Sequence, residues 1–217
     1  MQTAEGATTT VAVPDYENEL DLSANWMVVF QKNRGVSENH IKLSKLKNLS
    51  EHEDFDIRHY SGILTYKTTV ELPESFLDNN RGIDLQFEKI ANMAAVEING
   101  IDCGVLWARP YSVDVVNGLK PGRNEIVVRV ANSWSNRLIG DEYFPREVKQ
   151  DVEGALREPI PNWAWRGNIA ERPEKRRVAF TTNRFYTKND PLPPSGLIGD
   201  VVLKKWIRVA TEQLSPQ

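Results

Sequence analysis

The sequence predicts an all-β protein that folds as a two-sheet antiparallel β-sandwich. Three observations favour this class: short runs of alternating or β-branched residues recur along the chain, turn residues separate these runs, and no long amphipathic helix pattern appears. Of the 217 residues, 40% are hydrophobic and 26% are charged, which is typical of a globular domain. The length suits a single sandwich domain.

Eight segments carry the strand pattern. They are 26–31, 63–72, 82–87, 94–98, 111–116, 125–131, 177–185 and 201–209. In the second segment Leu64 and Tyr66 alternate with Thr65 and Lys67. This period of two residues indicates a strand with one face in the core and the other in water. Residues 37–53 are the best candidate for a helix, with a loop of one or two turns as the alternative.

Turn signals divide the chain between these segments. Residues 99–100 (Asn-Gly) predict a tight hairpin, because both residues tolerate positive φ. Residues 121–122 (Pro-Gly) predict a second tight turn. Residues 1–20 are polar and patternless and are expected to form a linker or disordered tail, which leaves 21–217 as a single sandwich domain. Within that domain, the stretch at about 140–176 predicts a long functional or docking loop, because it is rich in Pro and Trp.

Charge and composition exclude several classes of function. The net charge of -3 provides no basic stripe for nucleic acid, so nucleic acid is not an expected partner. Cys103 is the only cysteine, which excludes an internal disulfide and a cysteine-based zinc site. His40, His52 and His59 have no ligand-like spacing, so we predict that they are solvated and bind no metal. No apolar run reaches the ~18 residues of a membrane span, and no targeting signal is visible.

An ordered set of short phrases carries a family resemblance. The phrases are YSGILTYK (60–67), VEING (96–100), GVLWARPYSVD (104–114), LKPGRNEI (119–126) and VAN (130–132). Over roughly residues 26–132 they resemble the sugar-binding domain of family 2 glycoside hydrolases. WSNRLIGDE (134–142), FTT (180–182) and PSGLIG (194–199) are similar to the related sandwich near the C-terminus of large bacterial α-L-rhamnosidase-like (family 106) proteins.

The resemblance implies a galactose-binding-like jelly roll inside a multidomain carbohydrate-active enzyme. In such enzymes the catalytic carboxylates usually lie on a separate barrel, for which this chain has no room. We therefore expect a non-catalytic accessory domain that packs on the catalytic domain of the same polypeptide and contacts carbohydrate in part. The alternative is an autonomous carbohydrate-binding module. The resemblance further implies a periplasmic or extracellular location, and it leaves room for a structural calcium ion as the only cofactor.

Candidate site residues follow from the chemistry of sugar recognition, which favours aromatic faces beside Arg, Asn and Asp. Those near strand ends are Trp107, Arg109, Tyr111, Trp134, Asn136, Arg137 and Asp141. The structural alternative places Trp107 and Tyr111 in the core and pairs Arg137 with Asp141 to hold the loop. Asn132 is expected to cap backbone groups at a strand end.

A second cluster lies in the long loop and consists of Trp163, Trp165 and Arg166. These side chains either bind a glycan or dock against a neighbouring domain. We favour docking, because two tryptophans on a loop are costly to expose and a partner should cover them.

No catalytic pair of carboxylates is predicted. A glycosidase needs two of them about 5 Å or about 6.5–9.5 Å apart in a cleft. Asp141 and Glu142 are neighbours whose side chains would diverge on an extended segment. Asp84, Glu97 and Asp114 fall within strand patterns and are expected to face water.

Overall fold

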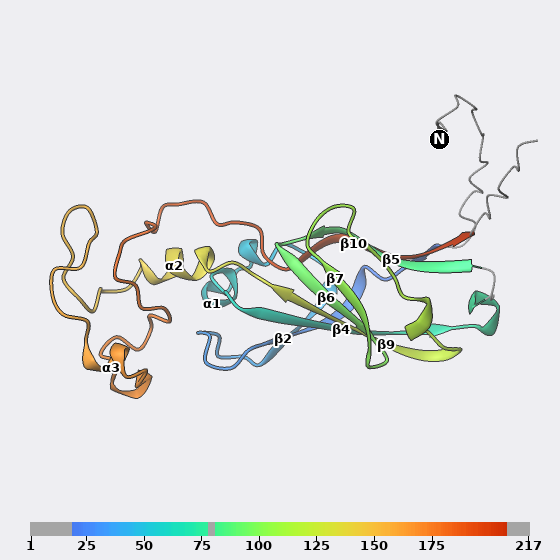
Figure 1. The fold of residues 1–217 in the computed structure, drawn as a ribbon, viewed down its shortest axis with the longest axis horizontal. Coiled ribbons are helices and arrows are strands. Elements are labelled where there is room, and N and C mark those ends of the chain that lie inside the picture. Colours follow the sequence, from blue (N-terminus) through green and yellow to red (C-terminus); the bar gives the residue numbers. More distant parts are fainter. Residues whose placement is uncertain (1–18, 78–80, 208–217) are drawn as a thin grey trace, which may run out of the picture.

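The computed structural model describes residues 19–77 and 81–207, which form two antiparallel sheets and a long extension (Figure 1). The six-stranded sheet has the order β3-β2-β4-β9-β6-β7, and the four-stranded sheet has the order β1-β10-β5-β8. The strands are β1 Glu19–Asp21, β2 Ala24–Phe30, β3 His40–Lys45, β4 Ile63–Leu72, β5 Arg81–Ile90, β6 Met93–Ile98, β7 Ile101–Leu106, β8 Ser112–Asp114, β9 Gly122–Ala131 and β10 Leu197–Ile207. The predicted all-β sandwich is confirmed.

Short helices connect or follow the strands. They are α1 Phe55–Arg58, α2 Ser135–Asp141, α3 Asn162–Trp165 and the 3-10 helices Leu49–Glu51, Glu74–Leu77, Val116–Gly118 and Ile169–Glu171. Asp54 caps α1, because its carboxylate accepts hydrogen bonds from the backbone N–H groups of Asp56 and Ile57. Of the predicted tail, residues 1–18 lie outside the described residues, and the last two belong to β1.

The core lies between the two sheets and follows the predicted alternation. In β4, Leu64 and Tyr66 are fully buried, while Ile63 on the opposite face is exposed. The Trp26 ring meets the Tyr66 ring edge to face, with 6.3 Å between the ring centroids. The Trp26 indole N–H donates to the carbonyl of Leu22, so its one polar atom is satisfied. Burial of these large side chains is the main source of stability for the sandwich.

Both predicted turns are present. Asn99 and Gly100 have φ values of 51° and 83° and join β6 to β7 in a hairpin. Gly122, with φ of 81°, opens β9 after Pro121. The buried amide of Asn124 holds this second turn, since it accepts from the backbone N–H of Lys120 and donates to the Lys120 carbonyl.

The start of β10 is tied to the end of β9 and to β4. Asn132 accepts a hydrogen bond from the Gly196 N–H and donates to the Ser195 hydroxyl, which confirms the predicted capping role. Gly196 has a φ of 86°, and a Cβ atom there would lie 2.1 Å from the Tyr66 hydroxyl oxygen. Only glycine therefore allows β10 to begin at this point.

The helix predicted for residues 37–53 is wrong. This segment contains β3, which pairs with β2, followed by the 3-10 helix Leu49–Glu51. Leu43 is buried between the exposed Lys42 and Ser44, which is the pattern of a half-buried strand. Pairing with the free edge of β2, rather than a local sequence signal, makes this segment a strand.

The strand predicted for residues 177–185 is also wrong. Among the described residues, its backbone forms one isolated bridge, between Asn183 and Ala155. The Arg177 side chain instead donates to the backbone carbonyls of Asp141 and Phe144. In the described part of the chain, none of the named strands pairs with this segment. Its β-forming composition therefore does not produce a strand.

Residues 133–190, which we call the extension, leave the sandwich between β9 and β10. Figure 1 shows the extension continuing the long axis of the sandwich, with α2 next to the sheets and α3 at the far end. It buries three hydrophobic side chains, Ile139, Val148 and Trp163, and none of them belongs to the main core. The loop predicted at about 140–176 thus continues to residue 190 as an ordered segment without a named strand.

Candidate functional site

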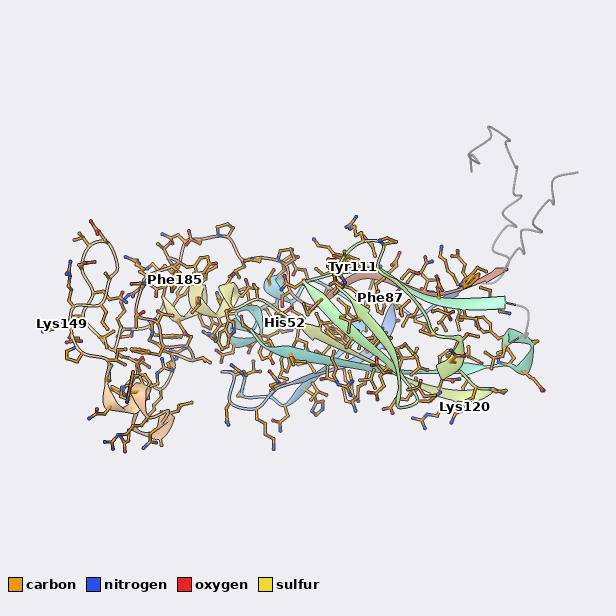
Figure 2. The ribbon with its side chains drawn as sticks, in the orientation of Figure 1. His52, Phe87, Tyr111, Lys120, Lys149 and Phe185 are labelled. Atoms are coloured by element: carbon orange, nitrogen blue, oxygen red, sulfur yellow. The ribbon has the colours of Figure 1, made fainter. Side chains whose placement is uncertain are left out.

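The loop between β7 and β8 carries three of the predicted site residues. Trp107 is 74% exposed, so the alternative that placed it in the core is wrong; the neighbouring Leu106 is the inward residue. Arg109 is also exposed. Tyr111 is half-buried and packs against the core, and its carbonyl accepts from the Phe87 N–H at 2.9 Å. Figure 2 shows Tyr111 and Phe87 near each other on the sandwich.

A hollow of about 460 Å³ lies beside this loop. Its lining includes Glu88, Arg109, Pro110 and Tyr111 but not Trp107. The Glu88 carboxylate is engaged, because it accepts from the Asp200 N–H at 3.0 Å. The structure therefore brings Arg109 and Tyr111 together and leaves Trp107 outside the hollow.

The predicted residues at 134–141 lie on or next to α2, and most of them are internal. Asn136, Arg137 and Asp141 are at most 2% exposed. Trp134 is exposed, and the Arg34 guanidinium lies 5.0 Å from the centre of its ring. Because a bound sugar would need accessible side chains, these four residues do not form one open binding surface.

Arg137 and Asp141 form a buried pair where α2 meets the sandwich. The Arg137 Nε atom lies 3.0 Å from Asp141 Oδ1, which confirms the predicted pairing. Among the described residues, none accepts a hydrogen bond from the two Arg137 Nη atoms, although Asp56 lies 4.0 Å from Nη1. Burial lowers the pKa of Arg137, and the charges of Asp141 and Asp56 oppose this shift.

Asp141 fastens α2 to the later part of the extension. Its carboxylate accepts hydrogen bonds from the backbone N–H groups of Val178 and Ala179, at 3.1 and 2.7 Å. The Arg137 backbone N–H donates to the Ser61 hydroxyl of the sandwich. Through these contacts, Asp141 and Arg137 link three parts of the chain that are far apart in sequence.

The tryptophans of the second predicted cluster have different environments. Trp163 is buried within the extension: its ring meets the Phe180 ring edge to face at 5.3 Å, and the Arg172 guanidinium lies 5.1 Å from its centre. Trp165 is 78% exposed, and Arg166 is exposed as well. The expectation that an outside partner covers both tryptophans is therefore wrong for Trp163, which the chain itself covers.

Arg172 and Glu147 form a second buried pair, which the sequence reasoning missed. Two nitrogen–oxygen distances of 2.6 and 2.8 Å make the contact bidentate. The Arg172 guanidinium also donates to the carbonyls of Val178 and Ala179. The mixture of arginines and acidic residues in the extension was the available signal, but it does not indicate which charges pair.

Asp141 and Glu142 do not face each other, although the reason differs from the predicted one. They lie at the end of α2, not on an extended segment. Asp141 pairs with Arg137, while Glu142 contacts Arg146 and lies 3.4 Å from Arg177. These contacts commit both carboxylates to holding the extension.

Four exposed apolar side chains gather at one end of the six-stranded sheet. We call Ile63, Met93, Val105 and Trp107 the sheet-end patch. Ile63 and Met93 both pair with Ala131 of β9 and flank it on the outward face. Val105 pairs with Ala95 on β6, two residues after Met93, and Trp107 follows the inward Leu106. Alternation along the strands thus places all four on the same face.

The extension contributes most of the other exposed apolar surface. Among the described residues, seven of the twelve exposed large hydrophobic side chains belong to it. They are Trp134, Tyr143, Val152, Ile160, Trp165, Ile169 and Phe185. Figure 2 shows Phe185 in this part of the molecule, well away from Tyr111. Exposed large apolar side chains are therefore more frequent in the extension than in the rest of the described chain.

His59 is buried, which corrects the prediction that all three histidines are solvated. It packs between Phe55 and Tyr143, and its Nδ1–H donates to the Phe55 carbonyl at 2.8 Å. Burial lowers the pKa of the His59 imidazole; the hydrogen bond to Phe55 opposes this, and the Arg137 charge adds to it. Protonation of His59 is therefore less favourable in the folded protein than in the unfolded chain.

This shift predicts a loss of stability in acid. Below the ordinary histidine pKa of about 6.5, the unfolded chain binds a proton that folded His59 resists, so the free energy of unfolding falls as the pH drops. One proton limits the slope to about 1.4 kcal/mol per pH unit. Urea denaturation at pH 7.5 and 5.5 measures it. His59→Gln should flatten the dependence and His40→Gln should not; equal behaviour of the two variants would contradict the assignment.

The described residues bring no three His, Cys, Asp or Glu side chains together in a group that could hold a metal ion. A structural calcium ion, for which the resemblance leaves room, would use loop carbonyls as well, and no observation tests it. Within 19–77 and 81–207, no helix is long and apolar enough to cross a membrane. Whether the predicted site residues bind carbohydrate also stays a prediction.

Comparison with known proteins identifies relatives of the chain. It is 34% identical over 195 residues to a putative beta-glucuronidase from Formosa agariphila, covering 90% of this chain and 16% of that protein. The structure of a rhamnosidase from Novosphingobium sp. PP1Y matches 94% of this chain and 16% of its own, with a TM-score of 0.69 and 29% identity. A β-glucuronidase structure from Ruminococcus gnavus shares the fold, with a TM-score of 0.55 and 19% identity over 91% of this chain and 31% of its own.

The chain therefore spans about a sixth of the length of its first two relatives. Residues 34–171, more than half of the chain, match the model of a domain family. That region contains β3 to β9 and α1 to α3, so the match includes most of the six-stranded sheet and much of the extension. The resemblance stated from the sequence phrases is confirmed: the chain belongs to the family of glycosyl hydrolase 2 galactose-binding domain-like domains.

Proposed function

We propose that this chain is a non-catalytic accessory domain of a larger glycoside hydrolase, and that its extension packs against the catalytic part of the same polypeptide. The observation that carries the proposal is the concentration of exposed apolar side chains in the extension. The relatives are glycoside hydrolases by name, and the chain spans only 16% of their length. A large remainder of such a polypeptide is thus available as the covering body.

The composition of the exposed surface supports docking. Trp165 and Arg166 stand next to each other at the far end of the extension, and Trp and Arg are enriched at the centres of protein interfaces. The buried pairs around Arg172 hold this end in place without a large core. A surface that is ordered before docking loses less conformational entropy when its partner binds.

The use of the carboxylates supports a non-catalytic role. Asp141, Glu142 and Glu147 each lie against an arginine inside the extension. A carboxylate that acts as nucleophile or general acid must reach a substrate in a cleft. These three instead contribute to the structure of the extension.

Substitution of Trp165 tests docking. Trp165→Ala should change the free energy of unfolding of the isolated chain by less than about 0.5 kcal/mol, because the side chain is 78% exposed. In the full-length enzyme, the same change should lower the melting temperature, since it removes a contact with the catalytic part. Ile101→Ala is the matched control. Ile101 is also an exposed apolar residue, but it lies at the start of β7 in the six-stranded sheet and not in the extension.

Two results would contradict the proposal. One is unchanged hydrogen exchange of residues 160–170 when the isolated chain and the full-length enzyme are compared. The other is hydrolysis of chromogenic glycosides by the isolated chain that a single carboxylate substitution abolishes.

The second candidate function is an autonomous carbohydrate-binding module, and the hollow beside Arg109 and Tyr111 favours it. Calorimetric binding of a glycan to the isolated chain, lost in Arg109→Ala, would support it. Trp163 is unsuitable for this test, because its removal would leave a cavity beneath Phe180.

A further inference from the structure

A separate hollow of about 840 Å³ lies at the other end of the six-stranded sheet, over β3, β2, β4 and the start of β9. Its lining includes Met27, Lys42, Lys67, Arg123 and Glu125. None of these residues belongs to the sheet-end patch or to the extension. Lys67 is four residues along β4 from Ile63, which separates the hollow from the patch by about 13 Å.

The strand register sets the spacing of the two lysines. Met27 pairs with Lys42 on one side and with Lys67 on the other. The three side chains therefore form one row across β3, β2 and β4 and point to the same face. Two strand spacings put the lysine Cα atoms about 9.6 Å apart, with the apolar Met27 side chain between them.

The hollow is cationic although the chain as a whole is not. Lys42, Lys67 and Arg123 form no ion pair with a described residue, and Glu125 is the only carboxylate in the lining. Counted over the lining alone, this gives an excess of two positive charges in a chain of net charge -3. Glu71, which lies opposite Arg123 in the strand register, offsets one of them, so the excess rests on the two lysines. Asn25, Ser44 and Thr69 add neutral hydrogen-bonding groups.

We propose that this hollow binds an acidic oligosaccharide, with Lys42 and Lys67 contacting its carboxylate or sulfate groups. The inference rests on the proposed function in one respect, namely that a domain of a glycoside hydrolase meets glycans. Hydrogen bonds from a lysine ammonium to an oxyanion are stronger than neutral ones. Two lysines on one face can therefore contact two anionic groups of the same oligosaccharide. Met27 offers an apolar surface for a ring face, and the neutral groups of the lining can bond to sugar hydroxyls.

Binding to the 217-residue chain is measured by calorimetry at low salt with two pairs of probes. Oligogalacturonate is compared with neutral galacto-oligosaccharide, and dextran sulfate with dextran, which separates carboxylate from sulfate recognition. Binding of an acidic probe but not of its neutral counterpart is expected. The double variant Lys42→Ser/Lys67→Ser should bind about tenfold more weakly, and added salt should weaken binding further.

Lys149→Ser/Lys188→Ser is the matched control, because it removes two exposed lysine charges from the extension. Figure 2 shows Lys149 there. Lys67→Arg should retain binding, since it keeps the cation. The proposal is overturned if neither acidic probe binds, if the control weakens binding as much as Lys42→Ser/Lys67→Ser, or if polyglutamate binds as tightly as the glycan. The docking proposal stands in each of these cases, because its test depends on Trp165.

Discussion

Asp141→Ala is expected to lower the free energy of unfolding by about 3–5 kcal/mol, because it leaves a buried cation without its partner. Arg137 and Asp141 are both fully buried, and their closest nitrogen–oxygen distance is 3.0 Å. The change also removes the acceptor for the N–H groups of Val178 and Ala179. Unpaired buried donors add to the cost.

Urea denaturation of the isolated chain measures this effect. Asp200→Ala is the matched control, because Asp200 is exposed, and we expect it to cost less than about 0.5 kcal/mol. In Arg137→Met/Asp141→Asn no uncompensated charge is left, so the double variant should be more stable than Asp141→Ala. A loss below about 1 kcal/mol in Asp141→Ala would mean that water reaches Arg137 and replaces its partner.

Local chemistry explains which parts of the fold could be predicted from the sequence. The turns at Asn99 and Gly122 depend on residues that accept positive φ. The alternation in β4 arises because one face of the strand is buried in the core and the other faces solvent. Both properties belong to a few adjacent residues. The strand β3 and the irregular course of 177–185 depend instead on whether a free strand edge lies nearby.

In the candidate site too, contacts between residues close in sequence could be predicted, whereas contacts between distant residues could not. The pairing of Arg137 with Asp141 was foreseen as an alternative, because opposite charges lie close together in the sequence. The helix α2 that brings them together was not predicted. The Arg172–Glu147 pair joins residues 25 positions apart in a segment without regular structure, so no period reveals it. Whether a tryptophan there is internal or exposed depends on such pairs.

The extension differs from the sandwich in what stabilises it. The extension buries three hydrophobic side chains and four charged ones. The charged side chains are those of Arg137, Asp141, Arg172 and Arg177. A buried ion pair contributes little beyond its desolvation cost, but loss of one partner is strongly destabilising. Among the described residues, Arg172 forms hydrogen bonds only with those of the extension, so we expect this part to unfold locally, with the sandwich intact, when Arg172 is replaced.

Arg172→Lys is expected to open the extension, although it conserves the charge. The Arg172 guanidinium makes two bonds to Glu147 and further bonds to the carbonyls of Val178 and Ala179. A lysine ammonium lacks the planar fork that satisfies these acceptors together. It also loses the stacking on the Trp163 ring. We expect a loss of about 2–4 kcal/mol, confined to the extension.

Hydrogen exchange and limited proteolysis measure this opening. In Arg172→Lys, amides of residues 145–185 should exchange faster and proteases should cleave there, while amides of β4 and β9 keep the protection of the unsubstituted chain. Arg166→Lys is the control, because Arg166 is exposed in the same extension, and it should leave both patterns unchanged. Equal loss of protection in β4 and in the extension would show that the two parts unfold as one cooperative unit. A local effect would instead show that the Arg172–Glu147 pair holds the extension in its folded arrangement independently of the sandwich.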